Sequence, residues 1–347
     1  MKIDIFATDG SPLGIVQQDI QGELPDRLGV GGSELGIFNL MNIFHDAGHE
    51  VRFYNNPRVA STAKFDQHDQ EDFDPDENRD VLIIFRTANS TLAKAKGYKV
   101  FYTHDQWTME EYPYNNVNNF CQKVVAISPY HADYLKKTYN LQNVVSIDLP
   151  VRMSEYDDTS IEKVPNRCLF SSVPDRGLHQ LRDVWDQIVA RVPYVSLVIT
   201  SDYRLWNSVI PLNEQYRARW IGVPNITFKG AIRRKDLIRE QLQAQMLIYP
   251  CTYFELFCYS VAEAQVAGAY PVTNDISCLP TTNMGSIIPG DVRWTGFRDM
   301  FVEEIVYNLL HPDEMKLRQV EVQKKARERF SFENILKQWN ELVFKKG

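Results

Sequence analysis

The chain is 347 residues long, with 44% hydrophobic residues, 24% charged residues and a formal net charge of −7. This length exceeds what one hydrophobic core commonly serves, so we expect two domains. The composition is that of a folded globular protein and excludes the disordered and fibrous classes. The negative charge disfavours a surface built mainly to bind nucleic-acid phosphates.

Cysteine usage and the length of the apolar runs bear on the cellular compartment. The five cysteines are odd in number and scattered, with neither CxxC spacing nor a histidine partner at metal-ligand spacing. We therefore expect reduced thiols in a cytoplasmic protein. No segment approaches the roughly 20 apolar residues that a membrane span requires, so we expect no integral membrane segment.

Strand-like apolar runs alternate with helical segments along the whole chain, which is typical of βαβ units and predicts an α/β fold. The clearest helix is predicted to begin at Ser33 and to end at Gly48, a residue suited to a C-terminal cap. The strands predicted in the first half are 2–8, 51–54, 81–86, 99–102, 124–128 and 144–149. Those predicted in the second half are 168–171, 195–200, 226–228, 246–249 and 270–273. Open parallel sheets bind ligands at the carboxyl ends of their strands, so the loops after these strands are the candidate sites.

An acidic, polar stretch at residues 66–80 is predicted to be a solvated loop. It contains Asp74 and Asp76 on either side of Pro75, and such an acidic pair can hold a divalent metal beneath a nucleotide sugar in a different transferase architecture. The loop interpretation is favoured, because proline fixes one backbone angle and the flanking charges are typical of a solvated segment. We therefore predict no metal site and no cofactor.

The strongest functional signal follows the predicted strand 246–249. Glu255 and Glu263 are eight positions apart, and a helix is predicted to begin near Cys258. Glu255 then lies in the loop before the helix, and Glu263 lies more than one turn inside it. The backbone N–H groups of the first turn lie between the two carboxylates and are directed at an anion. The arrangement predicts a nucleotide-sugar site with its diphosphate on the helix N-terminus.

Two other loops carry groups that suit an anion. The loop 171–177 follows the first strand of the second half and contains Arg176, whose planar guanidinium can hold two phosphate oxygens. In the first half, Gly31 and Gly32 open a predicted helix, and glycine lets a backbone approach a ligand closely. The spacing is not a dinucleotide-binding fingerprint, because Glu34 stands where its third glycine would fall.

His104 follows the predicted strand 99–102. A lone histidine at a strand end is often structural, but the strand placement and the adjacent glycine loop favour a functional role. Trp107, Tyr112 and Tyr114 come next in the chain. These aromatic side chains are suited either to stacking on a ring of the substrate or to simple packing.

Together these motifs resemble the signature of the retaining GT-B glycosyltransferases of group 1, or family 4. The resemblance covers nearly the whole chain and implies two Rossmann-like parallel-sheet domains facing a central cleft. It implies that residues 1–152 form the acceptor-side domain and residues 153–330 the nucleotide-sugar-binding domain, with the charged stretch 155–163 as linker. Residues 331–347 are then a helix that returns toward the first domain.

The resemblance also implies roles for single residues. Glu255 contacts the donor sugar, Glu263 binds the ribose hydroxyls, and Arg176 holds the diphosphate. His104 lies against the sugar or the acceptor, and Glu255, His104 and Arg176 are the expected catalytic residues. The groups expected to line the donor phosphates belong to Gly31, Gly32, Phe257, Cys258, Tyr259 and Ser260. The loop 171–177 departs from the family pattern, because a serine replaces one arginine and leaves one cation where two are usual.

The implied reaction is a metal-independent, hexosyltransferase-like transfer of a sugar from a nucleotide diphosphate sugar to an acceptor hydroxyl, with retention of anomeric configuration. The acceptor is left open among a glycan, a lipid, a protein, a small molecule and, as a minority option, hydroxymethylated DNA. The alternatives are a nucleotide-sugar epimerase or phosphorylase on the same fold, and a non-catalytic nucleotide-sugar-binding protein.

Overall fold

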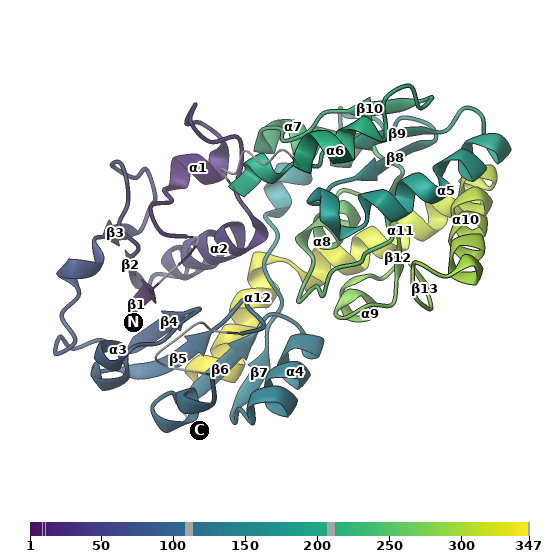
Figure 1. Cartoon of the computed structure of the whole chain (residues 1–347). Helices are drawn as coiled ribbons and strands as arrows, with labels where there is room; N and C mark the ends of the chain where they lie inside the picture. The colour runs from purple at the N-terminus through teal and green to yellow at the C-terminus, as the bar shows by residue number, and fades with distance from the viewer. Residues whose placement is uncertain (9, 11, 108–113, 207–211, 346–347) are drawn as a thin grey trace. The chain divides into compact units, whose positions relative to one another are not determined.

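The computed structural model describes residues 1–8, 10, 12–107, 114–206 and 212–345, and divides the chain into two compact units (Figure 1). Unit 1 comprises Met1–Glu23, Gly31–Pro150 and Ser331–Gly347, and unit 2 comprises Leu24–Val30 and Val151–Phe330. Each unit is built on a parallel sheet of its own.

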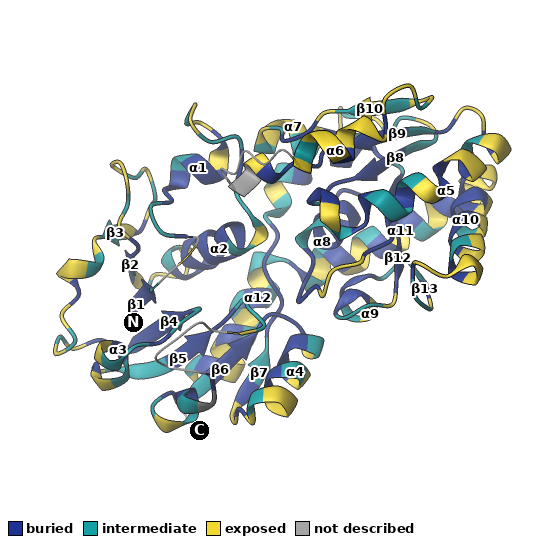
Figure 2. Ribbon diagram, in the orientation of Figure 1, coloured by how far each residue is buried: buried dark blue, intermediate teal, exposed yellow. Residues whose placement is uncertain are grey.

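The sheet of unit 1 has seven strands in the order β3-β2-β1-β4-β5-β6-β7. They are β1 (Lys2–Ala7), β2 (Glu50–Tyr54), β3 (Asp66–His68), β4 (Val81–Phe85), β5 (Tyr98–Tyr102), β6 (Lys123–Ala126) and β7 (Val144–Ser146). The central strands β1 and β4 are almost wholly buried, as parallel strands covered on both faces are (Figure 2). The strand order reverses between β1 and β4, which makes that position the topological switch point of the sheet.

The helices of unit 1 cover this sheet, and the longest is α2 (Gly32–Asp46). It begins one residue before the predicted start, buries Ile37 and Phe44, and ends just before Gly48, which has a φ of 82°. Trp339 packs edge-on against Phe44 with ring centroids 5.2 Å apart. The other helical segments are α1 (Gln17–Gln21), η1 (Gln70–Asp72), α3 (Ser90–Lys94), η2 (Tyr114–Asn119), α4 (Pro129–Tyr139), α12 (Phe332–Trp339) and η6 (Asn340–Phe344).

The sheet of unit 2 has six strands in the order β10-β9-β8-β11-β12-β13, with its switch point between β8 and β11. They are β8 (Arg167–Phe170), β9 (Ser196–Ile199), β10 (Ile226–Phe228), β11 (Met246–Tyr249), β12 (Tyr270–Asn274) and β13 (Ser286–Ile288). The helical segments are η3 (Met153–Tyr156), η4 (Pro174–Arg176), α5 (Leu178–Arg191), η5 (Tyr203–Trp206), α6 (Leu212–Ala218), α7 (Arg234–Gln243), α8 (Tyr259–Val266), α9 (Leu279–Thr282), α10 (Thr295–Leu310) and α11 (Pro312–Arg329).

Every strand predicted from the sequence is present, but β3 and β13 were not predicted. Because β3 begins at Asp66, the prediction that all of residues 66–80 form a loop is wrong. Both missed strands lie at the edge of a sheet, each paired on one side only. β3 consists of Asp66, Gln67 and His68, which lack the apolar pattern of a buried strand. β13 is three residues long, too short to show a period.

The charged stretch 155–163 is anchored in unit 2 through its last residue. The ammonium group of Lys163 donates hydrogen bonds to the carbonyl oxygens of Ala244 at 2.7 Å and Ala267 at 2.9 Å. These carbonyls belong to the C-terminal caps of α7 and α8, where a cation is favourable. Burial lowers the pKa of Lys163 to about 7.

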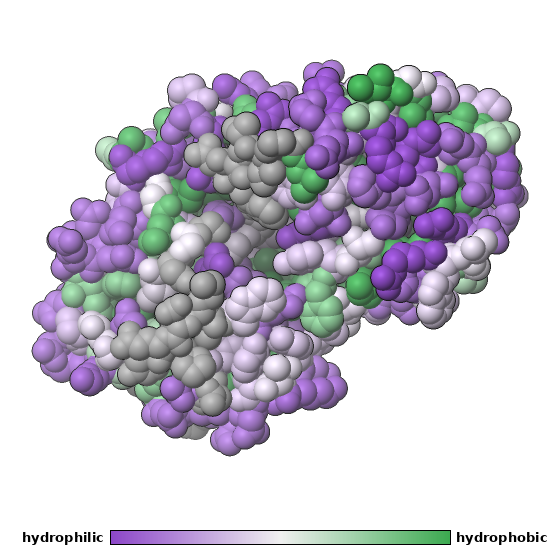
Figure 3. All heavy atoms as spheres, in the orientation of Figure 1, coloured by the Kyte–Doolittle hydropathy of each residue, from purple (hydrophilic) through white to green (hydrophobic). Residues whose placement is uncertain are grey.

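Hydrophilic side chains cover most of the visible surface, with isolated hydrophobic side chains among them (Figure 3). Large apolar side chains at the surface include Trp294, Ile221 and Leu317. Across the described ranges, no helix has the length and apolar character needed to cross a membrane.

Candidate active site

In unit 2 the loops after β8 and β11 meet at the carboxyl edge of the sheet, at its switch point. Gly177, with a φ of 130°, approaches the second loop so closely that a Cβ atom there would lie 2.3 Å from the carbonyl oxygen of Pro250. Glycine alone is compatible with this contact. The hydroxyl of Thr252 also donates a hydrogen bond to the carbonyl oxygen of Asp175 at 2.8 Å. The backbone itself therefore holds the two loops together.

This packing brings two of the predicted site residues into contact. Arg176 Nη1 donates a hydrogen bond to Glu255 Oε1 at 2.9 Å, and the hydroxyl of Tyr249 donates to the same oxygen at 2.8 Å. The Arg176 guanidinium also lies 4.0 Å from the ring centroid of Tyr253. Burial disfavours the charged form of Arg176, but the neighbouring Glu255 and Tyr249 outweigh it, and the pKa of Arg176 is raised. The pair is thus a half-buried cation and a buried carboxylate at the edge of the sheet.

Helix α8 begins directly after this pair, with Cys258 as its N-terminal cap, so the predicted helix start is confirmed. The first helical carbonyl is that of Cys258, which accepts from the N–H groups of Val261 and Ala262, both at 3.2 Å. The N–H groups at the start of a helix point along its axis out of the first turn, and this end of a helix favours an anion. The hydroxyl of Ser260 donates to the carbonyl oxygen of Ser171, which ties α8 to the loop after β8.

Phe257 and Tyr259, which were predicted at the donor site, also stabilise the core. Phe257 is 2% exposed, and its ring lies edge-on to Tyr259 at 5.5 Å and to Phe330 at 5.6 Å between centroids. The Phe257 side chain is therefore part of the packing, and only its backbone suits a ligand.

Glu263 lies in a second buried cluster, separate from the pair described above. Its Oε1 atom is 2.6 Å from Arg234 Nη1, and its Oε2 atom accepts a hydrogen bond from Gln241 Nε2 at 3.1 Å. Arg234 Nη2 also donates to Glu155 at 2.5 Å. Within the described part of the chain, no hydrogen bond or ion pair joins Glu263 to Glu255. A carboxylate has about four acceptor positions, so these partners do not exhaust the acceptor capacity of Glu263, which is 4% exposed.

Arg234 and Tyr249 are site residues that the sequence pattern did not predict. Arg234 is the first residue of α7 and follows Arg233, although a helix N-terminus disfavours cations. Clustered basic residues at a helix start are the signal that a carboxylate partner is near. Tyr249 is the last residue of a buried strand in the sequence pattern. That pattern gives no sign that its hydroxyl reaches Glu255.

In unit 1, His104 lies just beyond the carboxyl end of β5, beside the start of α2. Its Nδ1 atom is 2.9 Å from Ser33 Oγ. The imidazole lies edge-on to the rings of Phe85 and Tyr102, with centroids 4.8 and 4.6 Å away. Burial and, to a smaller extent, the cation of Arg86 lower the pKa of His104 well below its ordinary value. The imidazole is therefore neutral at pH 7.

The remaining residues predicted for the first half of the chain differ in their surroundings. Gly31 is the N-terminal cap of α2 and Gly32 is its first residue, so both lie at the start of a 15-residue helix. Tyr114 is buried, and its hydroxyl is 2.6 Å from that of a buried threonine, so it serves packing. Trp107 is 59% exposed. Tyr112 lies outside the described residues.

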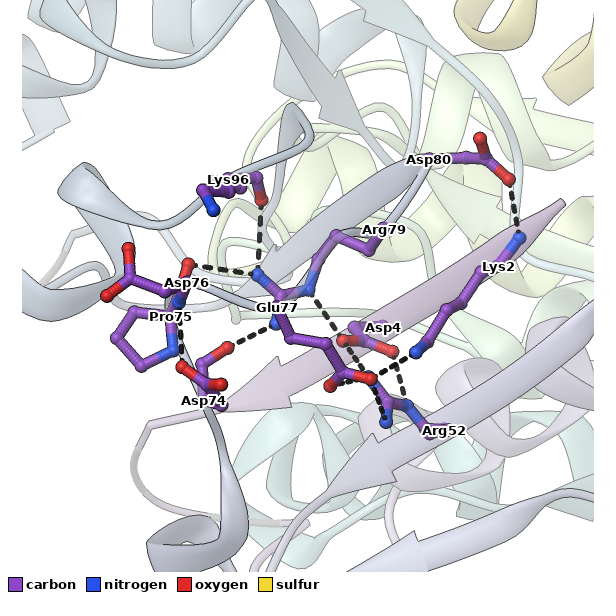
Figure 4. A network of polar contacts seen from close by, with 10 residues as sticks. All are labelled: Lys2, Asp4, Arg52, Asp74, Pro75, Asp76, Glu77, Arg79, Asp80 and Lys96. Atoms are coloured by element: carbon purple, nitrogen blue, oxygen red, sulfur yellow. Dashed lines mark hydrogen bonds and ion pairs between the residues drawn. The ribbon is translucent and has the colours of Figure 1, made fainter.

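The acidic pair considered as a metal site belongs to a structural network (Figure 4). Asp4 is fully buried on β1 and accepts hydrogen bonds from Arg52 Nη2 and Arg79 Nε, both at 2.6 Å. Arg79 Nη2 donates to the Asp74 carbonyl oxygen at 2.5 Å, and Asp74 Oδ1 accepts from the Asp76 amide at 2.8 Å. Asp74 therefore closes a turn that Arg79 anchors. In the parts of the chain that the structure covers, no three or more His, Cys, Asp or Glu residues are grouped to hold a metal ion.

No protein-family model matches the sequence, and no curated protein matches it. Solved structures match the chain over its length. Anabaena HepE in complex with UDP and glucose has a TM-score of 0.69 and 14% identity, covering 99% of each chain. A sucrose-phosphate synthase from Thermosynechococcus elongatus has a TM-score of 0.71 and 13% identity, covering 99% of this chain and 98% of its own. A glycosyltransferase from Rickettsia africae has a TM-score of 0.69 and 14% identity, covering 99% and 100%.

These neighbours are GT-B glycosyltransferases, and the two parallel-sheet units of this chain have the same fold. The predicted GT-B architecture is confirmed. Since the sequence identities are low, the likeness establishes the fold alone. Any inference about the reaction has to rest on the residues at the edges of the two sheets.

Proposed function

We propose that this chain is a glycosyltransferase that moves a sugar from a nucleotide diphosphate sugar to an acceptor hydroxyl. The observation that supports it most is the Arg176–Glu255 pair at the switch point of unit 2, directly before the N-terminus of α8. A cation, a carboxylate and helix amides at one sheet edge suit a diphosphate with a sugar attached. The HepE neighbour was crystallised with UDP and glucose, so uridine nucleotide sugars are the first donors to test.

The proposed reaction breaks the bond between the anomeric carbon and the diphosphate oxygen and forms a bond from the acceptor oxygen to the same carbon. The electron pair of the broken bond stays on the diphosphate, whose oxygen takes the proton of the acceptor hydroxyl. Arg176 and the first amides of α8 stabilise the departing charge, so no metal is required. Glu255 stabilises the positive charge that develops on the sugar. Attack on the face from which the diphosphate leaves retains the anomeric configuration.

Other parts of the chain have supporting roles in this proposal. Glu263 binds the ribose of the donor, and residues 153–330 form the donor-binding domain. Residues 1–152 carry His104, Gly31 and Gly32 and take the acceptor, while residues 331–347 complete that domain. The five buried thiols support a reducing, cytoplasmic setting.

The test is a panel of UDP-, GDP- and ADP-sugars incubated with glycan, lipid, protein, small-molecule and hydroxymethylated DNA acceptors. We expect mass spectrometry to show one acceptor gaining the mass of the sugar, with release of the nucleoside diphosphate, and NMR to show retained configuration. Donor binding without transfer or hydrolysis would identify a binding protein. An epimerised donor without acceptor, or turnover that requires inorganic phosphate, would identify the enzymatic alternatives. A chain that binds no nucleotide sugar would refute the proposal.

A further inference from the structure

Among the described residues, one ring nitrogen of His104 has a hydrogen-bond partner and the other has none. Its Nδ1 atom faces the hydroxyl of Ser33 at 2.9 Å. Its Nε2 atom is buried and has no hydrogen-bond partner among the residues that the structure describes. Native proteins keep few buried polar atoms unsatisfied, because the lost hydrogen bonds to water are then not replaced. Nε2 therefore has a hydrogen-bonding capacity that no described residue uses.

Packing fixes the position of the imidazole. The rings of Phe85 and Tyr102 present an edge-on wall, at interplanar angles of 82° and 89° to the imidazole. On the side of α2, a Cβ atom at Gly36 would lie 3.3 Å from His104 Cε1 and 3.2 Å from Leu149 Cδ2. The helix therefore lies as close to the ring as a glycine allows. With the ring held in place, its chemistry depends on which nitrogen carries the proton.

Hydrogen-bond counting decides where the proton lies. A serine hydroxyl can donate or accept, and the contact to His104 is the one hydrogen bond that the Ser33 hydroxyl makes within the described residues. If Ser33 donates to Nδ1, its hydroxyl hydrogen is satisfied and the ring proton resides on Nε2. If Nδ1 donated instead, the Ser33 hydrogen would have no acceptor in the described part of the protein.

We propose that Ser33 is a positioning residue that donates its hydroxyl hydrogen to Nδ1 of His104, so that Nε2 carries the proton and donates a hydrogen bond to an oxygen atom of the substrate. The inference rests on the proposed function for the identity of that substrate. It assigns Ser33 a role that acts through His104, without a contact of its own to the reacting atoms.

The surroundings of His104 keep its ring neutral, so the ring has a single proton that lies on one nitrogen or the other. Burial, then Arg86 and then His131, lower its pKa well below the ordinary value, so the ring is neutral and has one proton to place. Arg86 is held by Asp105, with its Nε atom 2.7 Å from Asp105 Oδ2. His131 is itself buried, and burial lowers its pKa to about 4, so Arg86 is the charged neighbour at neutral pH.

The first test needs no substrate. Nitrogen NMR of the full chain with labelled histidine, in which the His104→Ala spectrum assigns the His104 signals among the seven histidines, reports which ring nitrogen is protonated. We expect protonated Nε2 in the natural chain, a mixture of tautomers in Ser33→Ala, and recovery in Ser33→Thr, which keeps the hydroxyl. Protonated Nδ1 in the natural chain, or no change in Ser33→Ala, would overturn the proposal.

The second test uses turnover of whichever donor of the panel the natural chain accepts. Removing one neutral hydrogen bond should lower kcat roughly two- to tenfold in Ser33→Ala with little change in the donor KM. In the His104→Ala background the same change should have no further effect, because the two residues act as one unit. Multiplicative losses would contradict the inference. If the natural chain has no turnover, the proposed function fails, and the NMR result still decides the role of Ser33.

Discussion

Replacing Arg176 by alanine separates two roles of this side chain, the binding of a diphosphate and the neutralisation of Glu255. A charge-assisted hydrogen bond contributes about 1.5–3 kcal/mol. At about 1.4 kcal/mol for each tenfold change, Arg176→Ala should weaken nucleoside diphosphate binding by roughly ten- to 150-fold. The affinities for UDP, GDP and ADP should be measured in turn by isothermal titration calorimetry.

The same substitution should also lower the stability of unit 2. Glu255 is 6% exposed, and without Arg176 it keeps only the Tyr249 hydroxyl among the two donors described above. Breaking a fully buried ion pair costs about 3–5 kcal/mol. Because the Arg176 side chain is 21% exposed, water partly replaces the lost partner, and we expect a smaller loss of about 1–3 kcal/mol in urea unfolding.

Two further variants distinguish the roles. Arg191→Ala removes an arginine from the far end of α5, where it pairs on the surface with Glu303, and should change neither quantity. Glu255→Gln removes the competing carboxylate charge, so diphosphate affinity should stay the same or increase while turnover falls. If Arg176→Ala folds normally and binds nucleoside diphosphate with unchanged affinity, Arg176 is not a phosphate ligand, and the donor site described for unit 2 is wrong.

Four other outcomes are expected. Glu263→Gln should raise the donor KM by roughly ten- to a hundredfold with kcat preserved, whereas Glu255→Gln should depress kcat itself; a change in KM alone for both would contradict these roles. Gly177→Ala should lower the free energy of unfolding by about 2–4 kcal/mol. The same change at Gly222, which has a φ of 75° and open space around its Cα, should cost about 1 kcal/mol, and equal losses would argue against the backbone clash. Asp4→Asn should cost about 3–5 kcal/mol, measured by urea unfolding, because Arg79 loses its buried counter-charge; a neutral result would remove this network as a stabilising element. Turnover should persist in EDTA, and activity abolished by EDTA and restored by manganese would show that a metal takes part.

Local patterns in the sequence were enough to predict every strand except β3 and β13, together with helix α2. The central strands are continuous apolar runs because both their faces are covered, and α2 shows a helical period with a glycine stop. Those features depend on neighbours within a few residues of one another. The edge strands β3 and β13 escaped prediction because each is three residues long, and β3 is wholly polar, so neither shows a strand period in its side chains.

The candidate site likewise has a part that the local sequence predicts and a part that it does not. Glu255, Cys258 and the start of α8 lie within one short segment, so the sequence alone determined that a carboxylate precedes a helix N-terminus. Only the tertiary structure decided that Arg176 pairs with Glu255, because these residues are 79 positions apart and meet through the pairing of β8 with β11.

The same holds in unit 1, where Ser33 and His104 are 71 positions apart and meet because α2 packs against the end of β5. The sequence by itself determined most of the strands and helices along the chain, the helix starts that suit an anion, and the candidate residues on single loops. The crossover connections of the parallel sheets bring remote loops to one edge. They decided which of those residues share a hydrogen bond. No local pattern encodes such a contact, since its energy depends on atoms that are adjacent only after the sheet has formed.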